Sequence, residues 1–168
     1  MKHRAFLGLV LMLCLSAIAQ TVASGIPDEV TAWLKSYVAS RTNFDGGPVP
    51  YPESPTLVEG ELGTDGAAAL VFTLGAIRGG TDHLQYLAVF WKRNGHYVFC
   101  CSRRVGGKGI GSVESVTFQG RAIRLSGNQF VPGTDAMCCP SKPYVRDIAI
   151  RGSKLVDARA SNNRWRGP

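Results

Sequence analysis

Apolar and polar residues alternate along most of this chain, and the pattern predicts strands far more often than helices. The alternating or apolar runs have strand length, and glycine-containing turns separate them. We expect seven or eight strands in one antiparallel sheet, in segments 56–62, 67–74, 84–92, 96–103, 112–118, 122–125, 144–151 and 154–158.

The clearest hairpin surrounds Asn94-Gly95, a dipeptide that favours a tight turn between antiparallel strands. A two-residue loop fixes the expected register, in which these residues face one another: Phe90 and Phe99, Trp91 and Val98, Val89 and Cys100, Ala88 and Cys101. Both faces of this hairpin are apolar. It should therefore lie in the centre of the sheet, with each face covered.

A helix is expected over residues 27–41, near the start of the chain. Pro27 suits a first turn, and Asp28 and Glu29 complement the positive end of the helix. Apolar residues then recur at helical spacing: Ile26, Val30, Trp33, Leu34, Tyr37 and Val38. The pattern predicts an α+β fold, with this helix packed on one face of a twisted sheet and the other face meeting a curled part of the same sheet, as in a half-barrel.

The first 19 residues have the pattern of an export signal. Basic residues Lys2 and Arg4 precede the apolar run 5–15, and Ala17-Ile18-Ala19 has small residues where a signal peptidase cleaves. A membrane anchor is the alternative, but the run is shorter than the roughly 20 residues that a spanning helix needs. We expect a periplasmic or secreted chain beginning at Gln20, with no transmembrane segment in its mature form.

Length and composition then fit one domain over residues 20–160, followed by a flexible basic tail at 161–168. The chain carries a formal net charge of +7, distributed unevenly. Residues 20–77 hold two basic and seven acidic side chains, whereas residues 78–168 hold 15 basic and five acidic ones. This asymmetry can attract an anionic partner, or the two halves can pack together and neutralise each other.

Four cysteines remain after cleavage of the signal: Cys100, Cys101, Cys138 and Cys139. An even count in an exported chain predicts disulfides. Neighbouring strand residues point to opposite faces, so we expect two crossed bonds that clamp the fold, Cys100–Cys139 and Cys101–Cys138. Bonds within each pair, or one crossed bond with two free thiols, are the alternatives. A metal site is disfavoured, because adjacent strand cysteines direct their thiolates apart. We expect no metal and no cofactor.

The first candidate for a binding site is the glycine-rich segment 103–112, which carries Arg103, Arg104 and Lys108. Convergent backbone amides and three basic side chains can hold a phosphate or carboxylate. The segment is not a P-loop, since Gly109 follows Lys108 where Ser or Thr is required. A flexible connection with solvated charges is the alternative interpretation.

Catalysis finds little support in the sequence. Outside the signal there are two histidines, no Gly-x-Ser-x-Gly elbow and no His-x-x-x-His pair. We expect a non-enzymatic binding or inhibitor-like module for an anionic glycan, a lipid head group or an acidic protein. The alternatives are an envelope-maintenance protein that contacts other proteins and a metal or redox protein that uses the cysteine pairs.

One segment resembles a known group of proteins. Asp135-Ala136-Met137-Cys138-Cys139-Pro140-Ser141, followed by a strand that contains Tyr144, resembles a segment of small exported bacterial proteins of uncharacterised function. The likeness covers roughly residues 56–157. It implies a periplasmic or secreted bacterial protein, and it implies no activity and no site residues.

Overall fold

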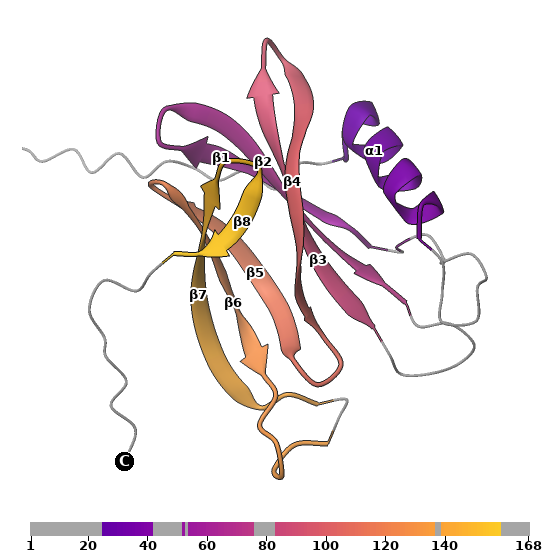
Figure 1. Ribbon diagram of the computed structural model, residues 1–168, viewed down its shortest axis with the longest axis vertical. Helices are drawn as coiled ribbons and strands as arrows, with labels where there is room; N and C mark the ends of the chain where they lie inside the picture. Colours follow the sequence, from indigo (N-terminus) through magenta and orange to yellow (C-terminus); the bar gives the residue numbers. More distant parts are fainter. Residues whose placement is uncertain (1–24, 42–51, 53, 76–82, 137–138, 159–168) are drawn as a thin grey trace, which may run out of the picture.

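The computed structural model describes residues 25–41, 52, 54–75, 83–136 and 139–158. It contains one helix and one eight-stranded antiparallel sheet, which confirms the α+β class (Figure 1). The predicted signal at 1–19 and the tail at 161–168 lie outside the described residues. The elements are α1 (Asp28–Ala39), β1 (Thr56–Leu62), β2 (Asp65–Leu74), β3 (Leu84–Arg93), β4 (His96–Gly107), β5 (Gly111–Gln119), β6 (Ala122–Gln129), β7 (Lys142–Arg151) and β8 (Lys154–Asp157).

The strands lie in the sheet in the order in which they occur along the chain. The predicted turn at Asn94-Gly95 is present, with φ values of 51° and 85° that a turn of this kind requires. The ladder between β4 and β5 is the shortest in the sheet and contains a single pair, Gly107 and Gly111. It therefore consists of two four-stranded halves, β1–β4 and β5–β8.

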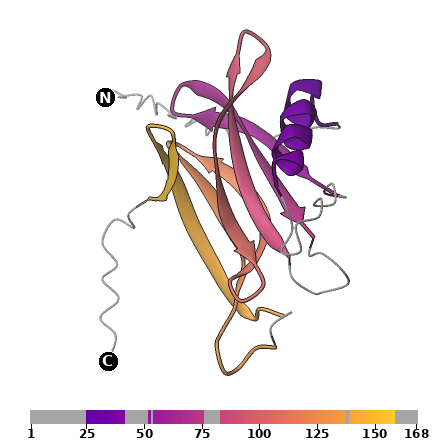
Figure 2. The same ribbon diagram turned by 45° about the vertical axis from the view of Figure 1, so that its right-hand side comes forward.

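The two halves curl toward each other, so that β1 contacts β5 and β4 contacts β8 (Figure 2). At one corner the Gly63 amide donates to the Gly120 carbonyl oxygen at 2.8 Å. The space between the halves is filled by an inner core whose largest fully buried side chains come from both of them: Leu87, Val89, Ile123, Leu125 and Ile148. Burial of these side chains against one another is the main force that closes the curl.

The helix α1 covers the outer face of β2, β3 and β4 (Figure 1). Its buried stripe consists of Val30, Leu34 and Val38, at the predicted helical spacing. These residues pack against alternate residues of β2 and β3, among them Phe72 and Phe90, which are 1% exposed. The two faces of the central strands are therefore covered as predicted, one by the helix and the other by the curled sheet. Within the described residues no helix has the length and apolar character that crossing a membrane requires.

The predicted hairpin register is correct near the turn and wrong beyond it. Phe90 pairs with Phe99, but Val89 pairs with Cys101 instead of Cys100. A β-bulge at this point leaves Cys100 as an extra residue on β4. Both cysteines then contact the inner core, whereas regular alternation would place them on opposite faces.

The predicted disulfide clamp between β4 and the segment before β7 is not formed. Cys100 and Cys101 are free thiols, so neither is the partner of Cys139, which is disulfide-bonded; Cys138 lies outside the described residues. Sheet register gives the reason. Gly107, Gly111, Gln129 and Lys142 form one row across the sheet. Cys101 lies six residues to one side of this row, about 20 Å along the strand, and Cys139 lies beyond Lys142 on the other side. A disulfide requires Cα atoms within roughly 7 Å.

Candidate ligand-binding site

The structure does not gather the three predicted anion-binding residues around one point. Strand β4 continues through Gly107, so Arg103 and Arg104 lie on a strand and point to opposite faces. Arg103 donates two hydrogen bonds of 3.2 Å to the carboxylate of Asp157 on β8. Arg104 pairs in register with Tyr86, which packs on the outer cluster beneath α1, and its Nε donates to the Gly106 carbonyl. Lys108 lies in the following turn, where its backbone amide bonds to His83.

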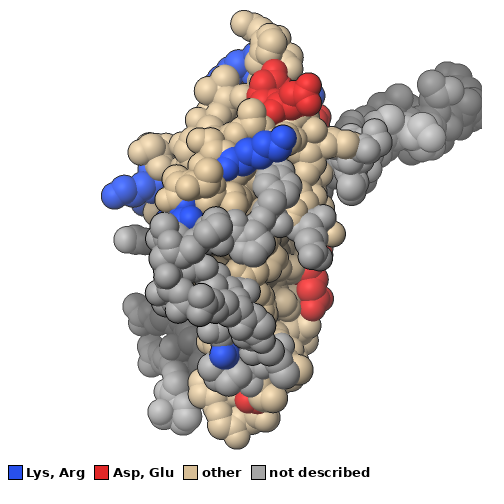
Figure 3. Space-filling view, turned by 90° about the vertical axis from the view of Figure 1, so that its right-hand side faces the viewer, with Lys and Arg blue, Asp and Glu red and all other residues tan. Residues whose placement is uncertain are grey.

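Charged side chains of both signs are also mixed on the surface that carries α1 (Figure 3). Lys92 pairs with Glu59 at 2.8 Å, and His96 contacts Glu29 at 2.9 Å between the hairpin tip and the helix. The basic surplus of the sequence therefore does not produce one continuous basic patch on the described part of this face.

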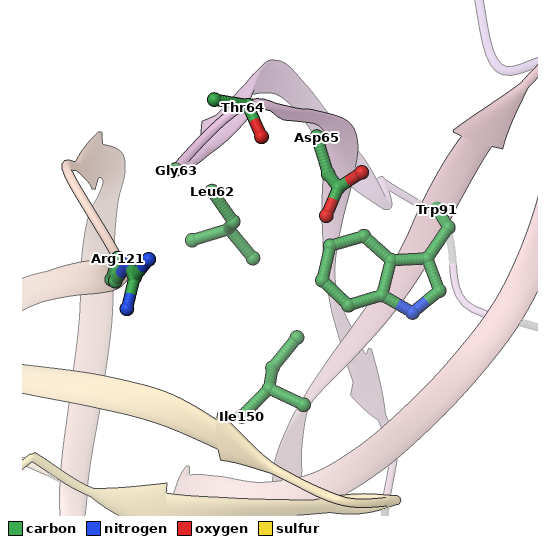
Figure 4. A pocket seen from close by; sticks show the side chains of 7 residues that line it. All are labelled: Leu62, Gly63, Thr64, Asp65, Trp91, Arg121 and Ile150. Carbon is green, nitrogen blue, oxygen red and sulfur yellow. The ribbon is translucent and has the colours of Figure 1, made fainter.

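A different site lies at the open end of the curl, where the β1–β2 turn, the β5–β6 turn and the ends of β3 and β7 converge (Figure 4). These elements line an open cavity of about 230 Å³, which we call the mouth pocket. It is lined by Leu62, Gly63, Thr64, Asp65, Trp91, Arg121 and Ile150.

The floor of the mouth pocket is apolar because it is the end of the inner core. Leu62, Trp91 and Ile150 lie near the ends of β1, β3 and β7, and their side chains face the cavity (Figure 4). Trp91 and Ile150 pack partly against the inner core and remain partly exposed. The two turns above this floor are joined by the hydrogen bond from Gly63 to Gly120.

Arg121 supplies the cation of the mouth pocket. It follows Gly120 in the β5–β6 turn, where it packs beside Gly63, so that a Cβ built on that glycine would lie 3.7 Å from Arg121 Nε. In the described part of the chain, no hydrogen bond or ion pair engages its guanidinium. Since a guanidinium stays charged at every physiological pH and offers five donors, Arg121 presents an unused anion-binding group to the cavity.

Among the described residues, Asp65 is the only carboxylate that lines the mouth pocket, and it is already paired. Its Oδ1 accepts a hydrogen bond from Arg93 Nη1 at 2.9 Å, and the Arg93 guanidinium lies 5.7 Å from the centre of the Trp91 ring. Arg93 thus neutralises the wall opposite Arg121. The uncompensated charge of the pocket is the positive charge of Arg121.

This arrangement suits a small ligand that combines an anionic group with an apolar body. The cavity is slightly smaller than the roughly 300–1,000 Å³ of typical drug-sized pockets. A carboxylate, sulfonate or phosphate can accept charge-assisted hydrogen bonds from Arg121, while the apolar part covers Trp91 and Ile150. Among the described residues there is no group of three His, Cys, Asp or Glu side chains placed to hold a metal ion.

The sequence predicted some parts of this site and not others. Trp91 was expected on an apolar face of the hairpin and is found there, and the gap between the expected strands 56–62 and 67–74 contains the observed turn at Gly63-Thr64, although β2 already begins at Asp65. Arg121 was not singled out, because the sequence around Gly120 shows only a hairpin turn. The sequence does show that Arg121 directly follows a turn glycine. It does not show that the β1–β2 turn lies beside Arg121, because that turn is distant in sequence.

Comparisons with protein-family models, with curated proteins and with solved structures find no match for this chain. The likeness to small exported bacterial proteins therefore stays a prediction from the sequence.

Proposed function

We propose that this chain is a non-enzymatic binding module whose mouth pocket takes a small anionic ligand with an apolar body. The observation that carries the proposal is the unengaged guanidinium of Arg121 above an apolar floor. Among the described residues, the lining contains no histidine, cysteine or lysine, and its carboxylate, Asp65, is paired with Arg93. A small ligand with an anionic group fits this geometry better than the anionic glycan or acidic protein expected from the sequence, because one cation faces one cavity of limited volume.

Both parts of the proposed ligand contribute to its affinity. A hydrogen bond to a charged group contributes about 1.5–3 kcal/mol, and the exposure of Arg121 to solvent reduces this contribution. Apolar area removed from water adds roughly 25 cal/mol per Å². The partial exposure of Trp91 and Ile150 leaves such area available in the unliganded protein.

The test uses 8-anilinonaphthalene-1-sulfonate, which has a sulfonate on an aromatic body and fluoresces when its surroundings become apolar. We expect it to bind the native protein, and Arg121→Gln to weaken its affinity about tenfold, the equivalent of about 1.4 kcal/mol. Arg151→Gln is the matched control, because Arg151 is an exposed arginine at the same end of the sheet and does not line the cavity. Unchanged affinity in Arg121→Gln, or an equal loss in both variants, would contradict the proposal.

We also propose that the chain is exported to the periplasm or beyond the cell. The support is the pattern of residues 1–19, in which a basic start, an apolar run and small residues follow one another. Intact-mass measurement of the protein recovered outside the cytosol should give a chain that begins at Gln20. A full-length chain that remains in the cytosol would rule out the cleaved signal.

A further inference from the structure

Cys100 and Cys101 form a close pair of thiols on the concave side of β4. Successive residues of a regular strand point apart, but the bulge at Cys100 directs both side chains toward the inner core. The Cys101 thiol donates a hydrogen bond to Cys100 Sγ, and the two sulfur atoms are 3.2 Å apart. Cys101 is 4% exposed, whereas Cys100 is only half-buried.

We propose that Cys100 and Cys101 are a redox-active dithiol, which small disulfides oxidise reversibly to a disulfide between the two neighbouring residues. Three features support the assignment: the contact between the sulfurs, the accessibility of one of them, and the absence of another described cysteine within reach. Cys139 lies at the far end of the sheet. Each thiol of the pair is therefore the nearest partner of the other.

The difference in exposure sets the order of the two exchange steps. The Cys100 thiolate attacks one sulfur of a small disulfide RSSR, forming a mixed disulfide at Cys100 and releasing the first RS⁻. Cys101 then loses its proton and attacks the Cys100 sulfur, which forms the Cys100–Cys101 bond and releases the second RS⁻. The two released thiolates take up the two protons that the cysteines lose. Two electrons have passed from the cysteine pair to RSSR.

The local environment makes Cys101 the resolving residue. Burial is the main cause that raises the pKa of the Cys101 thiol to about 12, and its hydrogen bond to Cys100 adds to the effect. A thiol of this kind reacts poorly with a reagent from solvent. It can react with a sulfur held beside it, because the neighbouring position replaces a bimolecular encounter.

The fold also makes this disulfide easy to reduce. A bond between adjacent residues requires a geometry that an extended strand does not have, and strained disulfides have more oxidising potentials. Forming it must disturb the pairing of β4 with β3 next to the bulge, where Val89 and Cys101 are paired. The pair is thus suited to a reversible change, in contrast to a permanent crosslink.

The test exposes the folded protein to glutathione disulfide and maps the products by mass spectrometry. Trypsin cleaves after Arg93 and Arg103, so the peptide 94–103 contains this pair and no other cysteine. We expect this peptide to lose two hydrogens and to regain them with dithiothreitol. A stable glutathione adduct on the wild-type peptide, a bond to another cysteine, or two unmodified thiols would each overturn the proposal.

Two variants check the assigned roles. Cys101→Ala should accumulate glutathione on Cys100, because the resolving thiol is missing. Cys100→Ala should leave Cys101 unmodified in the folded protein and reactive in urea. Equal modification of both variants under native conditions would contradict the order of steps, and the wild-type result stands even where a variant folds poorly.

Discussion

At the scale of single residues, the best-defined ion pair joins Arg124 on β6 to Asp147 on β7. The two residues are directly opposite each other in the ladder. Arg124 Nε donates to Oδ1 at 2.8 Å, and Nη2 donates to Oδ2 at 3.0 Å. This two-point contact holds the pKa of Asp147 below its usual value, chiefly through the hydrogen bonds from Arg124, while slight burial acts in the opposite direction.

The lowered pKa of Asp147 predicts how the stability of the protein depends on pH. Because the unfolded carboxyl titrates near pH 4, the pair stabilises the fold fully above that pH and loses this effect as pH falls through the lower folded pKa. Asp147→Asn should reduce the free energy of unfolding at pH 7 by about 0.2–1 kcal/mol, the range for exposed pairs. Urea unfolding should show the difference from wild type narrowing as the pH falls below about 4.

Glu61→Gln provides the control for this prediction. Glu61 is an exposed carboxylate on β1, and no hydrogen bond or ion pair engages it in the described residues. Its replacement should leave the unfolding midpoint close to that of the wild type at pH 7 and at acidic pH. A difference between Asp147→Asn and wild type that is constant over the whole range would show that the variant acts through something other than the charge.

Residue patterns predicted which side chains point inward, but not which ones meet. Trp91 was expected on an apolar face of the central hairpin, and it contacts the inner core. Arg121 and Gly63 are far apart in sequence, and nothing local to either predicts that their turns share a hydrogen-bonded corner. The mouth pocket therefore depends on long-range placement that alternation alone does not encode.

At the scale of elements, segments with a strong sequence pattern were predicted correctly, and segments with a weak pattern were not. The helix was expected over 27–41 and is found at Asp28–Ala39, because its apolar stripe and acidic first turn agree. The segment 103–107 was interpreted as part of a loop on account of its glycines, yet it belongs to β4. Gly106 has a packing reason, since a Cβ there would lie 2.7 Å from Gln85 Oε1. Because Gly106 has no side chain, it leaves room for the Gln85 side chain of the neighbouring strand β3.

The bulge at Cys100 is the second feature of the strands that the sequence did not predict, and it has the larger consequence. A two-residue turn fixes register only until the first inserted residue, and no residue type in 96–101 marks where that insertion occurs. One extra residue moved Cys101 from the outer face to the inner core. The same shift removes the geometric basis of the crossed disulfides and creates the thiol pair.

At the scale of the whole molecule, one side chain connects the two halves of the sheet where backbone pairing fails. Gln85 on β3 reaches past Gly106 to β5. Its Oε1 accepts a hydrogen bond from the Val113 amide at 2.7 Å, and its Nε2 donates to the Val113 carbonyl at 3.2 Å. The Gln85 amide thus takes the place of a strand peptide beside the single-pair ladder of β4 and β5.

Removing this link should loosen the joint between the halves. Gln85→Leu keeps a similar volume but leaves the N–H and C=O of Val113 without their partner, which costs about 1–3 kcal/mol for a buried polar group. We expect a lower urea midpoint and faster hydrogen exchange at the Val113 amide. Among the amides of the β6–β7 ladder, the ranking of hydrogen-exchange rates should stay the same. Gln119→Leu, at the exposed end of β5, should change neither quantity. Unaltered exchange at Val113 in Gln85→Leu would mean that the Gln85 side chain does not help to hold the halves together.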